Sequence, residues 1–293
     1  SVIMNVVPAQ VAGVNQVIAA SPARQDGTLA PAVLYAARYC GVAKFVKVGG
    51  AAAIAAMALG TETVARVDKI AGPGNRYVNE AKRQLWGSVG LDGYAGPSEV
   101  CVLVDEQSNP AFSAADFLTQ IEHAEDNAGF LVGTSEAAVQ GVLAEVDRQL
   151  ELASRREIMQ KAMDQFGAAI VCRDLLEACE IVNQIAPEHL SIAVADTDLA
   201  LDKIVNAGCI LVGEWTPESA GDFCAGPSHT LPTATAARFG SPVNVMDFLK
   251  FQSVLNLNRS SFEVLAPTIE AFGEMEGFPA HGYGARVRRL GGN

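Results

Sequence analysis

Short apolar runs alternate along the chain with longer segments in which apolar residues recur at the spacing of one helix face. Short strands separated by helices in this way indicate βαβ units, whose strands pair in parallel. Two such series follow one another. The expected strands are IMNVV, KFVKVGG, EVCVLVDE and AGFLVGT in the first series, and AAIVC, SIAVA and CILVGE in the second.

This alternation predicts an α/β fold of two Rossmann-like domains with mostly parallel sheets, followed by a small helical C-terminal segment. We expect the two domains at 1–127 and 128–245. Beyond Glu214 the alternation gives way to loops rich in Gly, Pro and Ser, and then to a helical piece, SFEVLAPTIEAFGEMEGF. The helical segment is therefore expected at 246–293. Loops that carry polar residues over a rigid scaffold are common sites of chemistry.

A pair of titratable residues, Glu188 and His189, lies where a predicted helix passes into a predicted strand. The helix is LLEACEIVNQI, the strand is SIAVA, and APEHL joins them. Pro187 ends the helix, because proline lacks a backbone donor and restricts the residue before it. The pair is either a solvated corner or two proton-transfer groups on a stiff turn, and the pattern leaves both interpretations open.

Composition and charge narrow the class of protein. The chain has 293 residues, of which 49% are hydrophobic, and a net charge of −12. No apolar run is long enough to span a membrane, and GGAAAIAAMALG is expected to be a buried helix. Lys and Arg are scattered rather than gathered in a stripe, which argues against a nucleic-acid partner. The six cysteines form no CxxC pair, so we expect reduced core thiols in a cytoplasmic protein.

Several polar residues could hold a metal ion. Gln120 and His123 are three apart on a predicted helix, so both side chains could reach one ion. Glutamine is an unusual zinc ligand, and an exposed helix end explains the pair equally well. Asp222 in PESAGDFCAGPSH is either an inward carboxylate or an ordinary turn aspartate. His229 and His281 also lie beside Gly or Pro, where a functional and a structural role are about equally expected.

A glycine-rich junction, KIAGPGNRYVNEAK, leads from a predicted strand through Gly72 and Asn75 into a predicted helix. Free backbone N–H groups at the start of a helix suit a phosphate. The GxGxxG fingerprint of dinucleotide-binding folds is absent, so a nucleotide loop and a tight turn both remain open. A similar loop, AGPSEV, offers Ser98 as a hydrogen-bonding group.

Taken together, six motifs resemble the histidinol dehydrogenase family over essentially the whole chain. They are KIAGPGNRYVNEAK, GYAGPSEV, QIEHAED, NQIAPEHL, PESAGDFCAGPSHTLPT with ARFGSPVNV, and EGFPAH, in the family's order. The resemblance implies an enzyme with one zinc ion per chain that uses NAD to oxidise L-histidinol, through the aldehyde, to L-histidine. It also implies a homodimer in which the C-terminal segment of each chain reaches into its partner's site, with no nucleic-acid or membrane partner.

The resemblance assigns roles to individual residues. Its catalytic acid/base pair is Glu188 and His189, and its NAD contact is Asn75. Its zinc ligands are Gln120, His123, Asp222 and His281. Its substrate contacts are Ser98, Glu218, His229 and Glu276, together with the zinc ligands and His189. In this scheme zinc is mainly a template for the substrate, His189 takes the alcohol proton, and Glu188 activates water to hydrate the aldehyde.

Two departures from the family pattern bear on the cofactor. The family usually has Gln in GGAQAIAA, where this chain has Ala52 in GGAAAIAA, and that Gln helps to bind NAD. Family members also have an N-terminal region that helps to form the NAD site, and this chain begins after it, as a cleaved piece, a fragment or a shortened homologue would. Two alternatives therefore stay open. One is a relative that oxidises another small alcohol, such as a sulfonated diol, and the other is an inactive zinc- or ligand-binding fragment.

Overall fold

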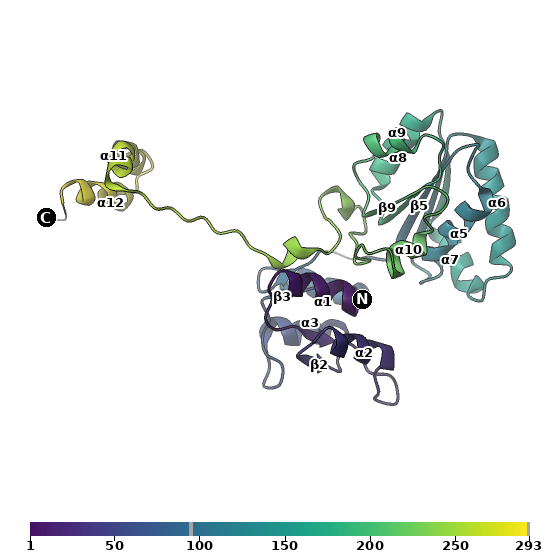
Figure 1. Cartoon of the computed structure of the whole chain (residues 1–293), viewed down its shortest axis with the longest axis horizontal. Coiled ribbons are helices and arrows are strands. Elements are labelled where there is room, and N and C mark those ends of the chain that lie inside the picture. Colours follow the sequence, from purple (N-terminus) through teal and green to yellow (C-terminus); the bar gives the residue numbers. More distant parts are fainter. Residues whose placement is uncertain (94–95, 292–293) are drawn as a thin grey trace. The chain divides into compact units, whose positions relative to one another are not determined.

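The computed structural model describes residues 1–93 and 96–291 and confirms an α/β fold (Figure 1). All strand pairs of the described sheets are parallel, as the alternating pattern predicts. The chain forms two compact units, Ser1–Leu249 and Lys250–Asn293. No helix among the described residues is long and apolar enough to cross a membrane.

Two small parallel sheets lie in the N-terminal part of the first unit. The strands β1 (Ile18–Ala20) and β2 (Lys44–Val46) form one, and β3 (Lys69–Ile70) and β4 (Gly90–Leu91) form the other. The accompanying helices are α1 (Val2–Val11), α2 (Pro31–Tyr39), α3 (Gly50–Leu59) and α4 (Arg76–Leu85). The alanine-rich α3 buries Ile54 and Ala58 in an apolar cluster with Ile70, which confirms that it is a core helix.

The expected strand IMNVV is wrong, because these residues belong to α1. Val6 and Ala9 are buried three residues apart on one face of this helix, whereas Ile3 and Val7 are exposed. A short apolar run fits a buried strand and a helix equally well. The spacing of the buried positions, which only the fold reveals, decides between them.

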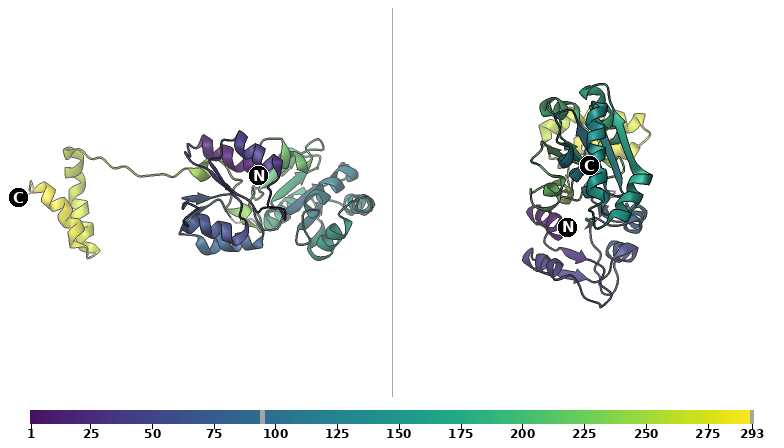
Figure 2. Two further views of the ribbon diagram at one scale, coloured as in Figure 1. Left: turned by 90° about the horizontal axis from the view of Figure 1, so that it is seen from below. Right: turned by 90° about the vertical axis from the view of Figure 1, so that its right-hand side faces the viewer.

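A five-stranded parallel sheet in the order β7-β6-β5-β8-β9 forms the main scaffold of the first unit. Figure 2 shows the ribbon from two further directions. Its strands are β5 (Glu99–Val104), β6 (Ala128–Gly133), β7 (Gly167–Val171), β8 (His189–Ile192) and β9 (Cys209–Val212). Its helices are α5 (Pro110–Ile121), α6 (Glu136–Leu150), α7 (Arg156–Phe166), α8 (Leu175–Ile185), α9 (Thr197–Lys203) and α10 (Glu218–Phe223).

The central strand β5 is buried on both faces. Val100, Val102 and Val104 pack in one apolar cluster with residues of α5, α6 and α7, and Cys101 and Leu103 pack in a second with residues of α8 and α9. Alternate residues of a strand face opposite sides of its sheet, and a parallel sheet covered by helices on both sides gives a continuous apolar run. This is why EVCVLV lacks polar residues after its first position.

The five-stranded sheet begins before the expected domain boundary at residue 127, since β5 pairs with β6 on one side and β8 on the other. Beyond α10, two short 3-10 helices (Ala236–Arg238 and Val245–Phe248) complete the first unit. The second unit contains α11 (Arg259–Met275) and α12 (Pro279–Arg289), which pack against each other as a hairpin. All six cysteines are free; four are buried, Cys209 is partly buried and Cys224 is exposed.

Candidate active site

A cluster of polar side chains lies at the amino ends of β5 and β8. His189 opens β8, and Val100 and Cys209 are its partners in the neighbouring strands. Gln120 comes from the C-terminal turn of α5, while Glu218 and Asp222 come from α10. A helix that follows a parallel strand returns to the sheet's amino end, and this topology carries Gln120 to His189. Ligand sites of open parallel sheets usually lie at the opposite, carboxyl end.

His189 faces two carboxylates. Its Nε2 atom lies 3.2 Å from Oε1 of Glu218 and 3.3 Å from Oδ1 of Asp222. The His189 and Glu218 side chains are almost fully buried, and that of Asp222 is 14% exposed. These three residues offer ligand atoms within 4.8 Å of one another, which is close enough to hold one metal ion. Among the residues that the structure describes, this is the one such group of His, Cys, Asp and Glu.

Gln120 lies against the same carboxylates. Its Nε2 donates to Oε1 of Glu218 at 2.6 Å and to Oδ2 of Asp222 at 3.0 Å. Its backbone oxygen accepts from the Asn127 side chain at 2.6 Å. Hydrogen bonds therefore hold both the side chain and the backbone of Gln120. Rotation of the amide exchanges its nitrogen and oxygen, and the same position can therefore present oxygen to a cation.

Electrostatics couple the three titratable groups. Burial opposes the charged form of His189, but its interactions with Asp222 and Glu188 and the charge of Glu218 outweigh burial and raise its pKa to about 11. Burial raises the pKa of Glu218 to about 7, with a further contribution from the charge of Asp222. Burial also opposes ionisation of Asp222, yet the His189 hydrogen bond and charge lower its pKa. A cation is therefore favoured between the carboxylates, either as the imidazolium or as a metal ion.

The turn that carries Glu188 is stiff. Ala186 ends α8 in the left-handed conformation, with φ of 49°, and Pro187 follows. A Cβ on Gly208 would lie 2.6 Å from the Glu188 backbone oxygen, so the neighbouring chain packs directly on this turn. Oε2 of Glu188 accepts from the Glu99 backbone N–H at 3.0 Å. Glu188 is 7% exposed and His189 2%, so the solvated-corner interpretation of this pair is excluded.

Other predicted residues lie around the cluster at different distances. His229 is adjacent, because its Nδ1 lies 3.1 Å from the backbone oxygen of Asp222. His123 is exposed at the end of α5, where its Nδ1 lies 3.3 Å from the Gln120 backbone oxygen. Ser98 directly precedes β5, and its backbone oxygen accepts from Ala128. Residues 94–95 of the GYAGPSEV motif lie outside the described residues.

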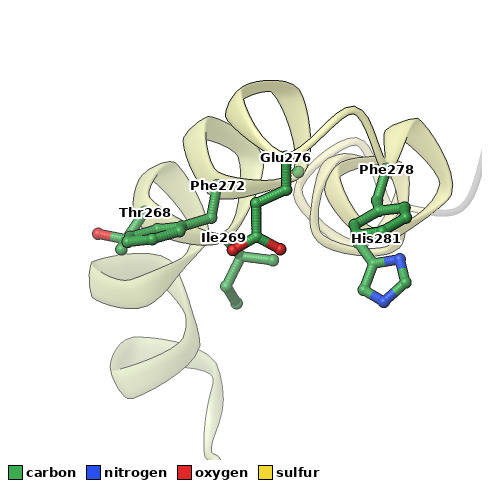
Figure 3. Close-up of a pocket in the computed structure, with 7 residues that line it drawn as sticks. Thr268, Ile269, Phe272, Glu276, Phe278 and His281 are labelled. Atoms are coloured by element: carbon green, nitrogen blue, oxygen red, sulfur yellow. The ribbon is translucent and has the colours of Figure 1, made fainter.

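Glu276 and His281 belong to the second unit. They line a hollow of about 280 Å³ on the α11–α12 hairpin, together with the apolar side chains of Ile269, Phe272 and Phe278 (Figure 3). Both polar residues are exposed. The hairpin thus presents a carboxylate and an imidazole at one apolar surface.

Two residues of the site were not anticipated from the sequence. Asp116 lies one helical turn before Gln120 on α5 and accepts from the Glu218 backbone N–H at 3.0 Å and from the Ser191 hydroxyl at 2.8 Å. Glu99 accepts from the Ala234 backbone N–H at 3.1 Å, and burial, with a contribution from the charge of Glu188, raises its pKa to about 7. The four-residue spacing of Asp116 and Gln120 on one helix face was the available sequence signal.

The Gly72–Asn75 loop connects β3 to α4, at the carboxyl end of β3. Gly72 has a φ of +127°, which side-chain-bearing residues rarely adopt, and a Cβ on Gly74 would lie 2.4 Å from Val78. Asn75 caps α4, since its Oδ1 accepts from the N–H groups of Tyr77 and Val78. Any ligand contact of Asn75 would therefore come mainly from its amide nitrogen. Ala52 lies exposed in the first turn of α3.

Comparison with known proteins gives consistent matches. Residues 1–289 match the family model described as histidinol dehydrogenase. The chain is 48% identical over 288 residues to histidinol dehydrogenase of Heliobacterium mobile, covering 98% of this chain and 67% of the relative. It is 47% identical over 292 residues to that of Bacillus subtilis (strain 168), covering 99% of this chain and 68% of the relative.

A solved structure supports the same similarity. The crystal structure of histidinol dehydrogenase from Elizabethkingia anophelis superimposes with a TM-score of 0.93 at 38% identity. The match covers 99% of this chain and 67% of that chain. The chain thus spans about two thirds of the length of these relatives.

Proposed function

Because the chain belongs to the histidinol dehydrogenase family, we propose that it performs the two-step, NAD-dependent oxidation of L-histidinol, through L-histidinal, to L-histidine. The observation that carries the proposal is the buried Glu188–His189 pair beside Gln120, Glu218 and Asp222. Proton acceptors and metal-binding groups within one small site are what this chemistry requires. The alternative of a relative acting on another small alcohol is not favoured by the matched family.

Each oxidation removes one hydride and needs a group that accepts a proton. In the first step His189, which would be neutral once a metal ion supplies the positive charge between the carboxylates, takes the proton of the alcohol O–H, and NAD, when bound, would accept the hydride from the same carbon. In the second, Glu188 removes a proton from water as its oxygen bonds to the aldehyde carbon, and the protonated His189 returns its proton to the carbonyl oxygen, which gives the hydrate. A second NAD, when bound, would accept the hydride that the hydrate loses. His189 again takes the O–H proton. The cofactor carries the hydride, while the protein supplies position and proton transfer.

The residues present fit a zinc ion. Gln120 and Asp222 lie side by side in the cluster, next to the buried and unpartnered Oε2 of Glu218, and His123 and His281 would add the imidazole ligands that zinc accepts. We assign the ligands as Gln120, His123, Asp222 and His281. Zinc, when bound, would orient the substrate's imidazole and amine. His189 and Glu218 then remain to handle protons and hold the substrate, and Ser98, His229 and Glu276 are its further contacts.

We also propose a homodimer in which Glu276 and His281 complete the site of the partner subunit. The segment before α11 supports an interface, because Phe251, Val254 and Leu255 are 89%, 88% and 91% exposed. Leaving three such side chains in water forfeits the free energy that burial would give. Large apolar side chains exposed close together in one short segment are a common feature of protein–protein contacts.

The decisive experiment measures NADH formation at 340 nm from L-histidinol and NAD with the zinc-loaded protein. We expect two NADH per histidinol consumed, with L-histidine as the product by chromatography. L-histidinal should give one NADH, and a sulfonated propanediol should give none. Zinc-loaded protein that binds metal but forms no NADH from L-histidinol would contradict the proposal and favour an inactive ligand-binding protein.

A further inference from the structure

A buried ion pair lies beside the Gly72–Asn75 loop, and neither of its residues belongs to the polar cluster of the active site. Nζ of Lys82 lies 2.8 Å from Oδ1 of Asp92, and each side chain is only 3% exposed. Lys82 comes from α4 and Asp92 directly follows β4. The pair thus connects the helix that begins at this loop to the strand beside it.

Both charges also bind the same glycine. The backbone N–H of Gly72 donates to Oδ2 of Asp92 at 2.7 Å, and the backbone oxygen of Gly72 accepts from Nζ of Lys82 at 2.6 Å. Gly72, Lys82 and Asp92 therefore form a closed ring of three charge-assisted contacts. Gly72 is also the residue whose φ of +127° turns the chain from β3 into the loop. The ring holds both polar groups of the residue at which the loop changes direction.

Stability alone is a poor explanation for this pair. Taking two charges out of water costs about as much as their attraction returns, and apolar residues of similar volume often do as well or better. The charges instead fix the orientation of the Gly72 peptide groups. With its oxygen bound by Lys82, the Gly72 carbonyl keeps its negative end toward the ammonium, where it cannot repel an approaching phosphate.

We propose that Lys82 and Asp92 are positioning residues that hold the Gly72–Asn75 loop in the shape that receives the phosphates of the dinucleotide. The inference rests on the proposed function and on the NAD contact that the family resemblance implies for Asn75 of this loop. Neither residue touches the cofactor in this scheme. Their effect is transmitted through Gly72, and so it falls on NAD and not on the alcohol substrate.

Two variants separate positioning from stability. Lys82→Met removes the ammonium and leaves Asp92 buried without its partner, so we expect a Tm lower by roughly ten degrees and a KM for NAD raised at least tenfold. The double variant Lys82→Met/Asp92→Asn has no buried charge, and an asparagine oxygen can still accept from Gly72. Its Tm should return most of the way to that of the parent. The Gly72 oxygen still lacks the Lys82 donor, so the KM for NAD should stay raised.

The specific readout is the contrast between the two substrates. In both variants, KM for L-histidinol and kcat at saturating NAD should stay within about twofold of the parent, because the active-site cluster is untouched. The matched control is Glu80→Gln on the same helix, which breaks the exposed pair with Arg83 and should change neither KM. If Lys82→Met does not fold, the double variant carries the test.

The inference is overturned if the double variant recovers the parent's KM for NAD together with its Tm. It is also overturned if KM rises equally for both substrates. If the parent forms no NADH, the proposed function fails, and calorimetric titration with NAD decides the inference separately. A dissociation constant for NAD that is raised about tenfold in the double variant supports the positioning role of Lys82 and Asp92. An unchanged constant, or no NAD binding by the parent, refutes it.

Discussion

Nδ1 of His189 lies 3.6 Å from Oε2 of Glu188, the residue before it in the chain. The opposite nitrogen of the same ring faces Asp222 at 3.3 Å. Glu188 instead accepts from the Glu99 backbone, on the side away from the two α10 carboxylates. Neighbours in sequence therefore have different surroundings, as expected if they perform different proton transfers.

We predict that Glu188→Gln and His189→Asn impair different steps. Glutamine retains an acceptor for the Glu99 N–H but is no base, so histidinal oxidation should slow by roughly two to four orders of magnitude, while histidinol oxidation to histidinal is largely spared. His189→Asn should slow both steps. Single-turnover NADH formation from each substrate measures the two effects. Equal losses in both steps for Glu188→Gln would show that the glutamate only orients His189.

Metal binding should depend on the assigned ligands. We expect one zinc per chain, and His123→Ala, Asp222→Ala and His281→Ala should each weaken zinc binding by roughly 100-fold or more and abolish turnover. Glu125→Gln, close to His123 and exposed in a pair with Lys161, is the control and should leave both unchanged. Competition with a chelator and elemental analysis provide the measurement. Full turnover after verified zinc removal would refute the assignment.

Glu218→Gln distinguishes the assigned ligands from the group that the geometry brings together. If His189, Glu218 and Asp222 were the ligands, losing a carboxylate there would weaken zinc binding as strongly as losing Asp222. In our assignment Glu218 contacts substrate, so the variant should keep its zinc and show a raised KM for L-histidinol. Loss of the metal would move Glu218 into the coordination sphere.

Most strands and helices of the scaffold were predictable, because the patterns that indicate them involve residues close together in the sequence. EVCVLV and AGFLVG form strands where short apolar runs meet turn residues, and LLEACEIVNQI forms α8 because its apolar residues repeat at helical spacing. The same rules misassigned α1 as a strand. They also could not detect α10, a six-residue helix in a Gly-rich loop, although it carries both Glu218 and Asp222.

Some members of the candidate site were predictable from the sequence, but its contacts were not. APEHL drew attention to Glu188 and His189 as a junction, and PESAGDFCAGPSH drew attention to Asp222. The motif resemblance added Glu218. Nothing local indicates that Asp116 holds the Glu218 backbone or that Glu99 lies beside Glu188. These contacts join residues that are 102 and 89 positions apart, so they follow from sheet topology and not from sequence pattern.

Glu99 should make stability fall as pH rises. Its folded pKa of about 7 lies above the ordinary value of 4.5, since burial disfavours its charged form, and Oε2 has no hydrogen-bond partner. Between pH 4.5 and 7 the folded state therefore holds the proton of Glu99 more tightly than the unfolded state does. The resulting contribution of Glu99 to the free energy of unfolding, on the order of 3 kcal/mol at most, is present at low pH and is lost as the pH rises through this range.

Glu99→Gln removes this titration while an amide oxygen can still accept from Ala234. We expect the difference in Tm, variant minus parent, to be more positive at pH 8 than at pH 5. Thermal unfolding followed by circular dichroism measures the difference. Glu80→Gln is the control, because hydrogen bonds from Arg83 and Gln84 lower the pKa of that exposed residue to about 2, and it should show no such gain. A difference in Tm between Glu99→Gln and the parent that does not change with pH would refute the raised pKa of Glu99.

The last prediction concerns the hairpin that carries Glu276 and His281. These residues line an apolar hollow of the second unit, and an extended segment of exposed apolar residues leads to it from Leu249. If each hairpin completes the site of the partner subunit, a His281→Ala chain and a His189→Ala chain are each inactive alone. Their hybrid dimer has one site in which His189 and His281 are both intact.

Equal mixing of the two variants after denaturation and refolding should therefore restore up to roughly a quarter of the parent activity, since half the dimers are hybrids and each has one working site. A mixture of His189→Ala with the double variant His189→Ala/His281→Ala contains no complete site and should stay inactive. Two different affinity tags isolate the hybrid, and NADH formation from L-histidinol measures it. Purified hybrid dimers without activity would show that each hairpin serves its own chain.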